Sequence, residues 1–179
     1  MSVQDIPALV DRVRALAECA ENRRKAALWA PEGADAKDHW RGTPRPFAET
    51  GAAPFTVEPE FPLWGEIIGF DLPTFYTDPD CYLENTLRIA IYRAEHLPEC
   101  TPVSKGVGIW LGVTLESSLF GARTLYAPHA SPWLDYAPTI ESERDLAALP
   151  LPDFYRSGLM PLAHRYYERI RTLLPADFT

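Results

Sequence analysis

The chain of 179 residues is long enough for one domain with a substantial core. Its 25 acidic and 17 basic residues give a net charge of −8, which argues against nucleic acid or an anionic membrane as the main partner, because phosphates are bound by clustered Lys and Arg. No stretch approaches the roughly 18 apolar residues of a membrane-spanning helix. Three widely spaced cysteines without a C-x-x-C pattern fit free thiols. We therefore expect a cytoplasmic protein with no membrane or nucleic-acid partner.

The N-terminal part combines a helical pattern with a proline-rich stretch. Residues 4–28 repeat apolar side chains at helical spacing, and Pro31 follows, so the pattern predicts an amphipathic helix. Residues 31–77 hold prolines at a density that opposes long regular elements, and they predict an irregular segment with room for one short strand. Aromatic side chains within this segment indicate that it packs against other parts of the protein.

The remaining sequence alternates helical and extended patterns. Residues 78–97 predict a helix with Asp78 as its N-cap, Pro79 at its first position and Pro98 at its end. Residues 102–113 ("PVSKGVGIWLGV") predict a strand, 126–138 a loop or short strand, and 157–174 the last helix. Ser142 and Asp145 form a capping pattern before a short helix. This order is typical of an α/β domain that spans 1–179, with a helix in 1–30, a proline-rich segment in 31–77 and βα units in 78–179.

Several motifs occur in an order that resembles the uroporphyrinogen decarboxylase superfamily. They are "FYTDPDCYLENTL", "TLESSLFGA" and "IESERDLAALPLPDF", and the similarity runs from about Asn22 onward. The superfamily includes the decarboxylases of haem synthesis and the corrinoid- or cobalamin-dependent methyltransferases. Its fold is a (β/α)₈ barrel with an N-terminal extension, and such a barrel usually needs about 250 residues. The resemblance therefore implies the N-terminal half of a TIM-type barrel, preceded by a helical and proline-rich extension.

The two branches of the superfamily predict different chemistry. Decarboxylases carry an arginine-rich loop that is missing here, and the place of their aspartate on the first barrel strand falls on Gly112, which disfavours tetrapyrrole decarboxylation. The methyltransferase branch has a "Thr-Val-Glu-Ala-Glu-x-x-Gly" stretch that matches residues 114–121, where Glu116 is kept and Ser118 replaces the second glutamate. Its zinc ligands lie in the C-terminal half. The resemblance thus implies no metal site and no cofactor bound by this chain alone, with a corrinoid supplied by a partner.

Four residues are candidates for a functional site. Glu116 is the candidate catalytic acid, at the C-terminal rim of a predicted strand, although an acid in a first helical turn also suits the helix dipole. Trp110, His129 and Arg41 are candidate substrate-binding residues, because loop histidines beside tryptophans can line a pocket and arginine can hold an anion. His96 and Cys100 have a spacing that metal ligands can use, but Pro98 interrupts the helix between them.

These features lead to two main hypotheses of function. In the first, the chain is a subunit of a uroporphyrinogen decarboxylase-like methyltransferase, which acts with a partner that completes the barrel. In the second, it is a non-catalytic half-barrel that scaffolds or regulates a complementary chain. The expected partner is either a chain that carries the C-terminal half-barrel or another copy of this chain.

Overall fold

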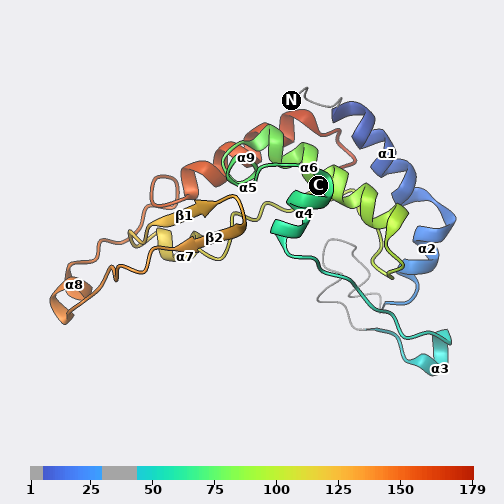
Figure 1. Cartoon of the computed structure of the whole chain (residues 1–179), viewed down its shortest axis with the longest axis horizontal. Helices are drawn as coiled ribbons and strands as arrows, with labels where there is room; N and C mark the ends of the chain where they lie inside the picture. The colour runs from blue at the N-terminus through green and yellow to red at the C-terminus, as the bar shows by residue number, and fades with distance from the viewer. Residues whose placement is uncertain (1–5, 30–43) are drawn as a thin grey trace. The chain divides into compact units, whose positions relative to one another are not determined.

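The computed structural model describes residues 6–29 and 44–179 as helices, a two-stranded sheet and connecting segments (Figure 1). None of the helices described is long and apolar enough to cross a membrane. The chain divides into two compact units. Unit 1 comprises Met1–Pro59, Leu83–Gly108 and Leu173–Thr179, and unit 2 comprises Glu60–Tyr82 and Ile109–Thr172.

Unit 1 begins with two helices, α1 (Ile6–Glu18) and α2 (Ala20–Ala26), where the sequence predicted one. The break lies at Cys19, which has an extended backbone and whose Sγ accepts a hydrogen bond of 3.3 Å from the Asn22 N–H. A thiol in the N-cap position therefore starts a second helix. The predicted apolar face of the first helix is confirmed, because Ile6, Val10 and Val13 are buried.

Two further helices contribute to unit 1. The short helix α3 (Phe47–Thr50) ends at Gly51, whose φ of 67° is in the left-handed region that favours glycine. The long helix α6 (Pro79–His96) begins in unit 2 and continues in unit 1. Its predicted cap is confirmed, since Asp78 Oδ1 accepts a hydrogen bond of 2.8 Å from the Cys81 N–H.

The predicted strand at 102–113 is wrong: within the described residues this segment pairs with no strand of a sheet. Its unit 1 part is held by other contacts. The Asn22 side chain accepts a hydrogen bond from the Val103 N–H at 2.7 Å and donates one to the Val103 carbonyl at 2.9 Å. Val107 N–H donates to the Thr179 carbonyl at 2.8 Å. An apolar, glycine-bearing run thus stays extended because side chains and the C-terminal residue satisfy its backbone.

A buried ionic network ties α6 to the segments on either side of it in unit 1. Arg93 Nε donates to Glu99 Oε1 at 2.7 Å, and its Nη2 donates to the Val57 carbonyl at 3.0 Å. Glu99 Oε2 also accepts hydrogen bonds from the Val57 N–H and from Thr101 Oγ1, both at 2.8 Å. The Glu99 side chain is only 1% exposed, so its charge depends on these partners.

Lowering the pH is expected to destabilise unit 1 through Glu99. Burial would raise the pKa of Glu99, but hydrogen bonds from Arg93, Val57 and Thr101 and the arginine charge hold it below its ordinary value. Because the folded pKa is the lower one, the carboxylate stabilises the fold above its unfolded pKa of about 4.3, and this contribution is lost as the pH falls through the folded pKa. Urea denaturation from about pH 7 to about pH 3 should therefore show a shallower loss of stability in Glu99→Gln than in the wild type. Parallel curves would contradict this assignment.

Unit 2 starts with two short helices, α4 (Phe61–Ile68) and α5 (Leu72–Phe75). The expectation of an irregular segment with one short strand is wrong here. Pro62 and Pro73 lie in the first turns of these helices, where the missing N–H costs nothing. Asp71 caps α5, since its Oδ2 accepts a hydrogen bond of 2.9 Å from the Thr74 N–H. The proline-rich sequence therefore forms helices whose starts coincide with its prolines.

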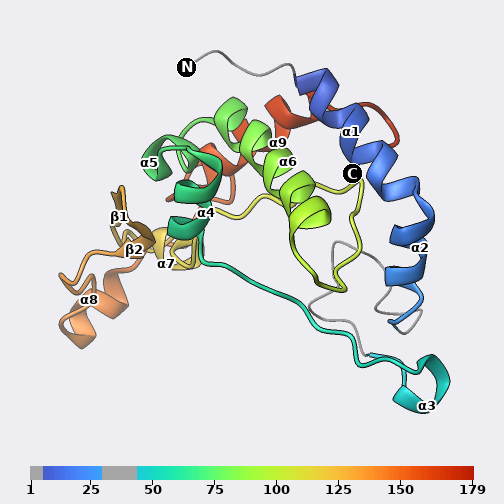
Figure 2. The same ribbon diagram turned by 45° about the vertical axis from the view of Figure 1, so that its right-hand side comes forward.

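The sheet of unit 2 is a hairpin of β1 (Thr124–Ala127) and β2 (Ala130–Leu134), paired antiparallel with a bulge between Leu125 and Ala127 (Figure 2). Its other helices are α7 (Leu115–Ser118), α8 (Glu143–Ala148) and α9 (Met160–Leu173), the last residue of which belongs to unit 1. The mixed α and β content agrees with the predicted class. The parallel strands of a half-barrel are not confirmed, because the hairpin is the sheet found in the described ranges.

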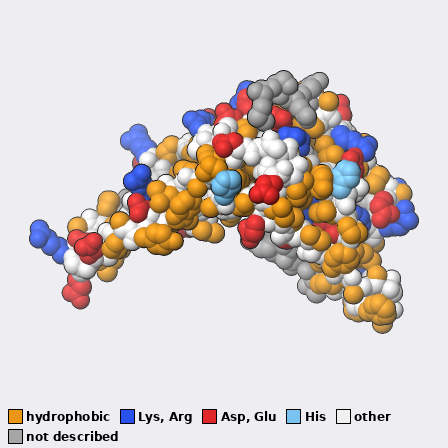
Figure 3. All heavy atoms as spheres, viewed as in Figure 1, with side chains coloured by type: hydrophobic (Ala, Val, Ile, Leu, Met, Phe, Trp, Pro, Cys, Tyr) orange, Lys and Arg blue, Asp and Glu red, His pale blue; other side chains and the backbone are white. Residues whose placement is uncertain are grey.

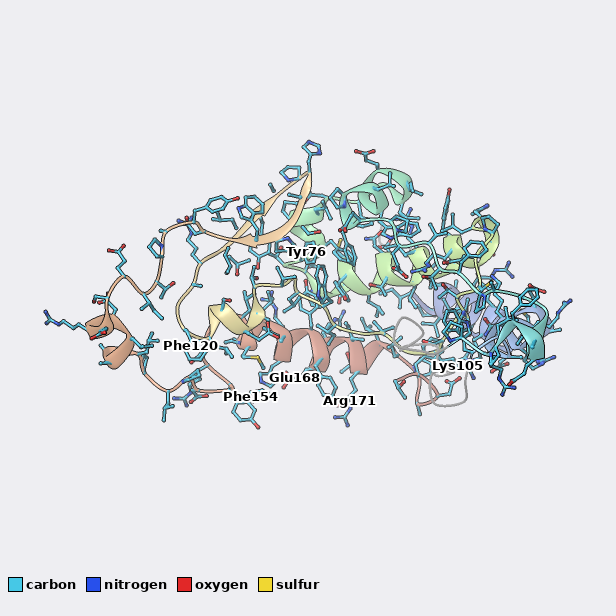
Figure 4. The ribbon with its side chains drawn as sticks, turned by 90° about the horizontal axis from the view of Figure 1, so that it is seen from below. Tyr76, Lys105, Phe120, Phe154, Glu168 and Arg171 are labelled. Carbon is cyan, nitrogen blue, oxygen red and sulfur yellow. The ribbon has the colours of Figure 1, made fainter. Side chains whose placement is uncertain are left out.

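Aromatic side chains form the core of unit 2. Phe75, Tyr76 and Tyr166 are at most 1% exposed, and Figure 4 shows Tyr76 among the side chains in the middle of this unit. Tyr166 Oη donates a hydrogen bond of 2.9 Å to the Phe75 carbonyl. The last predicted helix is confirmed as α9, which buries Tyr166 and Ile170. The capping pattern before α8 is also confirmed.

Candidate functional site

Glu116 lies on α7, a helix of one turn that is anchored at both ends. Thr114 precedes the helix and is fully buried, and its Oγ1 is hydrogen-bonded to Thr124 Oγ1 of β1 at 3.0 Å. At the other end, the buried Ser118 Oγ donates to the Leu115 carbonyl at 2.6 Å and accepts from the Leu159 N–H at 2.9 Å. These bonds tie the turn to β1 and to the start of α9.

The Glu116 side chain itself is exposed and forms no hydrogen bond or ion pair with the residues described. It is the second residue of α7 and does not cap the helix. A helix of four residues has only a small dipole for an acid to stabilise, because the dipole is a sum over aligned peptide units. The structure thus presents a carboxylate on a turn held at both ends, without a structural partner among the residues described.

Gly158 fixes the other side of this turn. Its φ is 54°, and a Cβ placed on it would overlap Ser118 Oγ and lie 2.5 Å from the Ser118 carbonyl oxygen. Only a residue without a side chain allows the chain before α9 to approach Ser118 this closely. The backbone geometry around Glu116 therefore depends on a glycine that is 42 residues away in the sequence.

Gly112 stands at the position where the resemblance to the decarboxylases would place an aspartate. It is buried, with a φ of 92°. A Cβ on Gly112 would lie 3.0 Å from the Pro132 Cβ, so any side chain would meet β2 and adopt a strained backbone. A glycine is what this packing requires.

Trp110 lies in an aromatic cluster of unit 2. Its ring stacks on Phe61 with a centroid separation of 5.1 Å and an interplanar angle of 14°, and it meets the ring of Tyr76 edge-on at 6.0 Å. The backbone N–H of Trp110 donates a hydrogen bond of 2.9 Å to Tyr82 Oη. The Trp110 side chain is 39% exposed, so one part of the ring is available to a ligand while the rest is held by the cluster.

Two buried hydroxyls lie next to this cluster. In the described part of the chain, Tyr76 Oη and Ser131 Oγ are inaccessible to solvent and have no hydrogen-bond partner. Burial raises the pKa of Tyr76. A buried polar group without a partner costs about 1–3 kcal/mol. Sequence patterns give no sign of this pair, because 55 residues separate its members.

The other predicted site residues are not joined to Glu116. His129 is exposed in the turn between β1 and β2. Among the described residues, no hydrogen bond, ion pair or ring contact connects Glu116, Trp110 and His129. Arg41 lies outside the described residues. The structure therefore supports separate features at Glu116 and Trp110, without showing a shared pocket.

The described residues offer no ligand set for a metal. They contain no group of three His, Cys, Asp or Glu side chains that could hold an ion. His96 is the last residue of α6, and its ring centroid lies 4.6 Å from that of Tyr92. The backbone N–H of Cys100 donates a hydrogen bond to the Phe55 carbonyl, and its carbonyl accepts one from the Trp29 indole N–H. The zinc chemistry of the methyltransferase branch does not fit the residues described.

Unit 1 contains an open cavity of about 330 Å³ between α1 and the C-terminal segment, lined by Pro7, Val10, Asp11, Arg14, Leu173, Leu174 and Pro175. Its arginine is already neutralised, since Arg14 Nε donates to Asp177 Oδ2 at 3.0 Å and Nη1 donates to Asp11 Oδ1 at 2.6 Å. The hydrogen bond from Arg14, a second hydrogen bond from Lys105 and the arginine charge lower the pKa of Asp177, although burial opposes them. The cavity therefore offers apolar walls without a free charge to bind an ionic substrate.

Compared with protein-family models, curated proteins and solved structures, the chain gives no match.

Proposed function

We propose that the chain is a subunit of a methyl-transferring enzyme in which Glu116 faces the substrate. The observation that carries this proposal is the exposed carboxylate of Glu116, which has no structural partner among the described residues and stands on a turn held by Thr114 and Ser118. Fixed positioning of a free acid is what general acid–base catalysis requires. The motif that Glu116 shares with the methyltransferase branch supports the same role.

Glu116 has two roles open to it in this proposal. As a carboxylate it accepts hydrogen bonds and can orient a donor group of the substrate, or it can accept a proton from a nucleophile. The methyl donor, the acceptor and any corrinoid or metal would be held by further protein. In the half-barrel form of this proposal, that protein supplies the C-terminal half of the barrel.

A second function, a non-catalytic scaffold, is supported by the apolar surface of unit 2. Fourteen large hydrophobic side chains are exposed in the described part of the chain, and twelve of them belong to unit 2. Among them, Phe154 is 60% and Tyr155 70% exposed, and their rings pack on His164 at 5.3 and 5.0 Å. Figure 4 shows Phe154 on the same side of α9 as Glu168 and Arg171. Exposed apolar clusters of this kind mark surfaces that bind other protein.

Affinity purification from the native source, with a tag on this chain, separates the two functions. The assembly would be given methylcobalamin and a simple thiol, and the methylcorrinoid absorbance would be followed. A catalytic subunit predicts thiol-dependent loss of that absorbance by the wild-type assembly. If the assembly forms but the methylcorrinoid absorbance does not fall, the methyl-transfer proposal is contradicted and the scaffold function is favoured.

Purified chain is expected to associate at high concentration through the Phe154 and Tyr155 cluster. Light scattering should give a mass that rises above the 20.1 kDa of one chain, because burial of exposed apolar side chains is favourable by roughly 25 cal/mol per Å². Phe154→Ser with Tyr155→Ser should shift the mass back toward one chain. A matched pair on unit 1, Phe47→Ser with Phe55→Ser, should change it little. A constant mass of one chain at all concentrations would contradict the prediction.

A further inference from the structure

The helix α4 is apolar on both of its faces. Its sequence "FPLWGEII" contains one charged residue, Glu66. At 100° per residue, Phe61, Trp64 and Ile68 share one face, and Leu63 and Ile67 share the opposite one. The first face is the inner one, since Trp64 is 3% exposed and Phe61 packs against Phe75.

The second face of α4 is open to solvent. Leu63 is 47% and Ile67 39% exposed, and they lie one turn apart, at i and i+4. A helix that is hydrophobic all round is normally buried on all sides. Figure 3 shows hydrophobic and acidic side chains next to each other over α4. The helix α4 thus resembles a core helix that is covered on one side only, and Leu63 and Ile67 define its uncovered outer face.

The outer face lies in the most acidic stretch of the chain. Residues 46–87 contain eight Asp or Glu and no Lys or Arg. Asp71 and Asp78 cap helices, and Asp80 binds Arg169 at 2.6 Å. Glu60 and Glu66, at the start and in the middle of α4, are exposed and form no ion pair with the residues described. Their charges are therefore available to a partner.

We propose that the outer face of α4 binds an amphipathic helix of a partner protein, whose apolar side chains cover Leu63 and Ile67 and whose Lys or Arg residues meet Glu60 and Glu66. The apolar pair at i and i+4 can pack against the apolar side of a partner helix, and charge complementarity fixes the orientation of that helix. The same acids repel anionic lipid, so the charge favours a basic protein segment over a membrane surface. The inference holds whether or not Glu116 is catalytic, because it concerns α4 and not the helix α7 that carries Glu116.

A synthetic amphipathic helix of leucine and lysine is a direct probe, measured by fluorescence anisotropy against the full chain. Leu63→Asn with Ile67→Asn is expected to weaken binding by about tenfold or more, because it removes the two apolar side chains that the partner helix would bury. The matched control Leu146→Asn with Leu151→Asn, which changes two side chains that are 60% and 96% exposed, should bind like the wild type. A peptide of the same composition with its amphipathic order scrambled should bind at least about tenfold more weakly.

The charge contribution is tested by Glu60→Gln with Glu66→Gln, which keeps the apolar face. This variant should weaken binding at low salt and flatten its salt dependence, because two rim charges are removed. Because this variant keeps Leu63 and Ile67, weaker binding by it would not result from misfolding of the apolar face, which could explain the loss in Leu63→Asn with Ile67→Asn. The proposal is overturned if the α4 and control variants bind the helix equally, or if the scrambled peptide binds as tightly. Sedimentation with phosphatidylserine vesicles that is lost in Leu63→Asn with Ile67→Asn would also overturn it, since the face would then belong to lipid.

Discussion

Gly158→Ala is expected to lower the free energy of unfolding by about 3 kcal/mol or more, because two costs combine at this position. The φ of 54° is strained for any residue with a Cβ. In addition, that Cβ would overlap Ser118, including its backbone carbonyl group. A backbone atom cannot move aside as the end of a flexible side chain can, so the overlap must be relieved by a shift of α7 or of the chain before α9.

A matched control separates the two costs. Gly69 also has a positive φ, 84°, but a Cβ there would have no atom within 4 Å. Gly69→Ala should therefore cost only the backbone term, about 1–2 kcal/mol. Urea or thermal denaturation of both variants measures the difference. Equal losses at the two glycines would mean that the close approach of Gly158 to Ser118 is not a feature of the folded protein.

The helices α1, α6, α8 and α9 were predictable from local sequence. Asp78 and Pro79 mark the start of α6, and Ser142 marks that of α8, because caps and first-turn prolines act within a few residues. The helices α4 and α5 differ from the expected irregular segment, because Pro62 and Pro73 lie in first turns, where a helix tolerates proline. The break at Cys19 was missed because a cysteine is an uncommon cap.

The extended parts and the polar network were harder to predict, because they depend on residues far apart in the sequence. An apolar, glycine-bearing run such as 102–113 reads as a strand, yet a strand also needs a partner that sequence periodicity does not identify. At the end of α7, Ser118 is hydrogen-bonded to Leu159, and in unit 1 Asn22 is hydrogen-bonded to Val103. Glu116 was identified by its motif. Its exposed position and its anchored turn required the structure.

Glu116→Gln is expected to lower methyl transfer by the assembled protein about a hundredfold or more, the typical contribution of a general acid or base. Glutamine keeps the shape of the side chain and removes its charge, and the turn is held by Thr114 and Ser118, so the position of residue 116 should not change. Stability should change by no more than about 0.3–1 kcal/mol, the range for an exposed charge in a first helical turn.

The control for Glu116 is Glu143→Gln, because Glu143 is also an exposed acid in the first turn of a short helix, α8. If both residues only interact with a helix dipole, the two variants should show the same small loss of stability and the same activity as the wild type. If Glu116 contacts the substrate, only its variant should lose turnover, with stability matched between the two. Measurement of activity and denaturation on both proteins thus separates a catalytic acid from an ordinary helix charge, and full turnover by Glu116→Gln would remove Glu116 from the proposed mechanism.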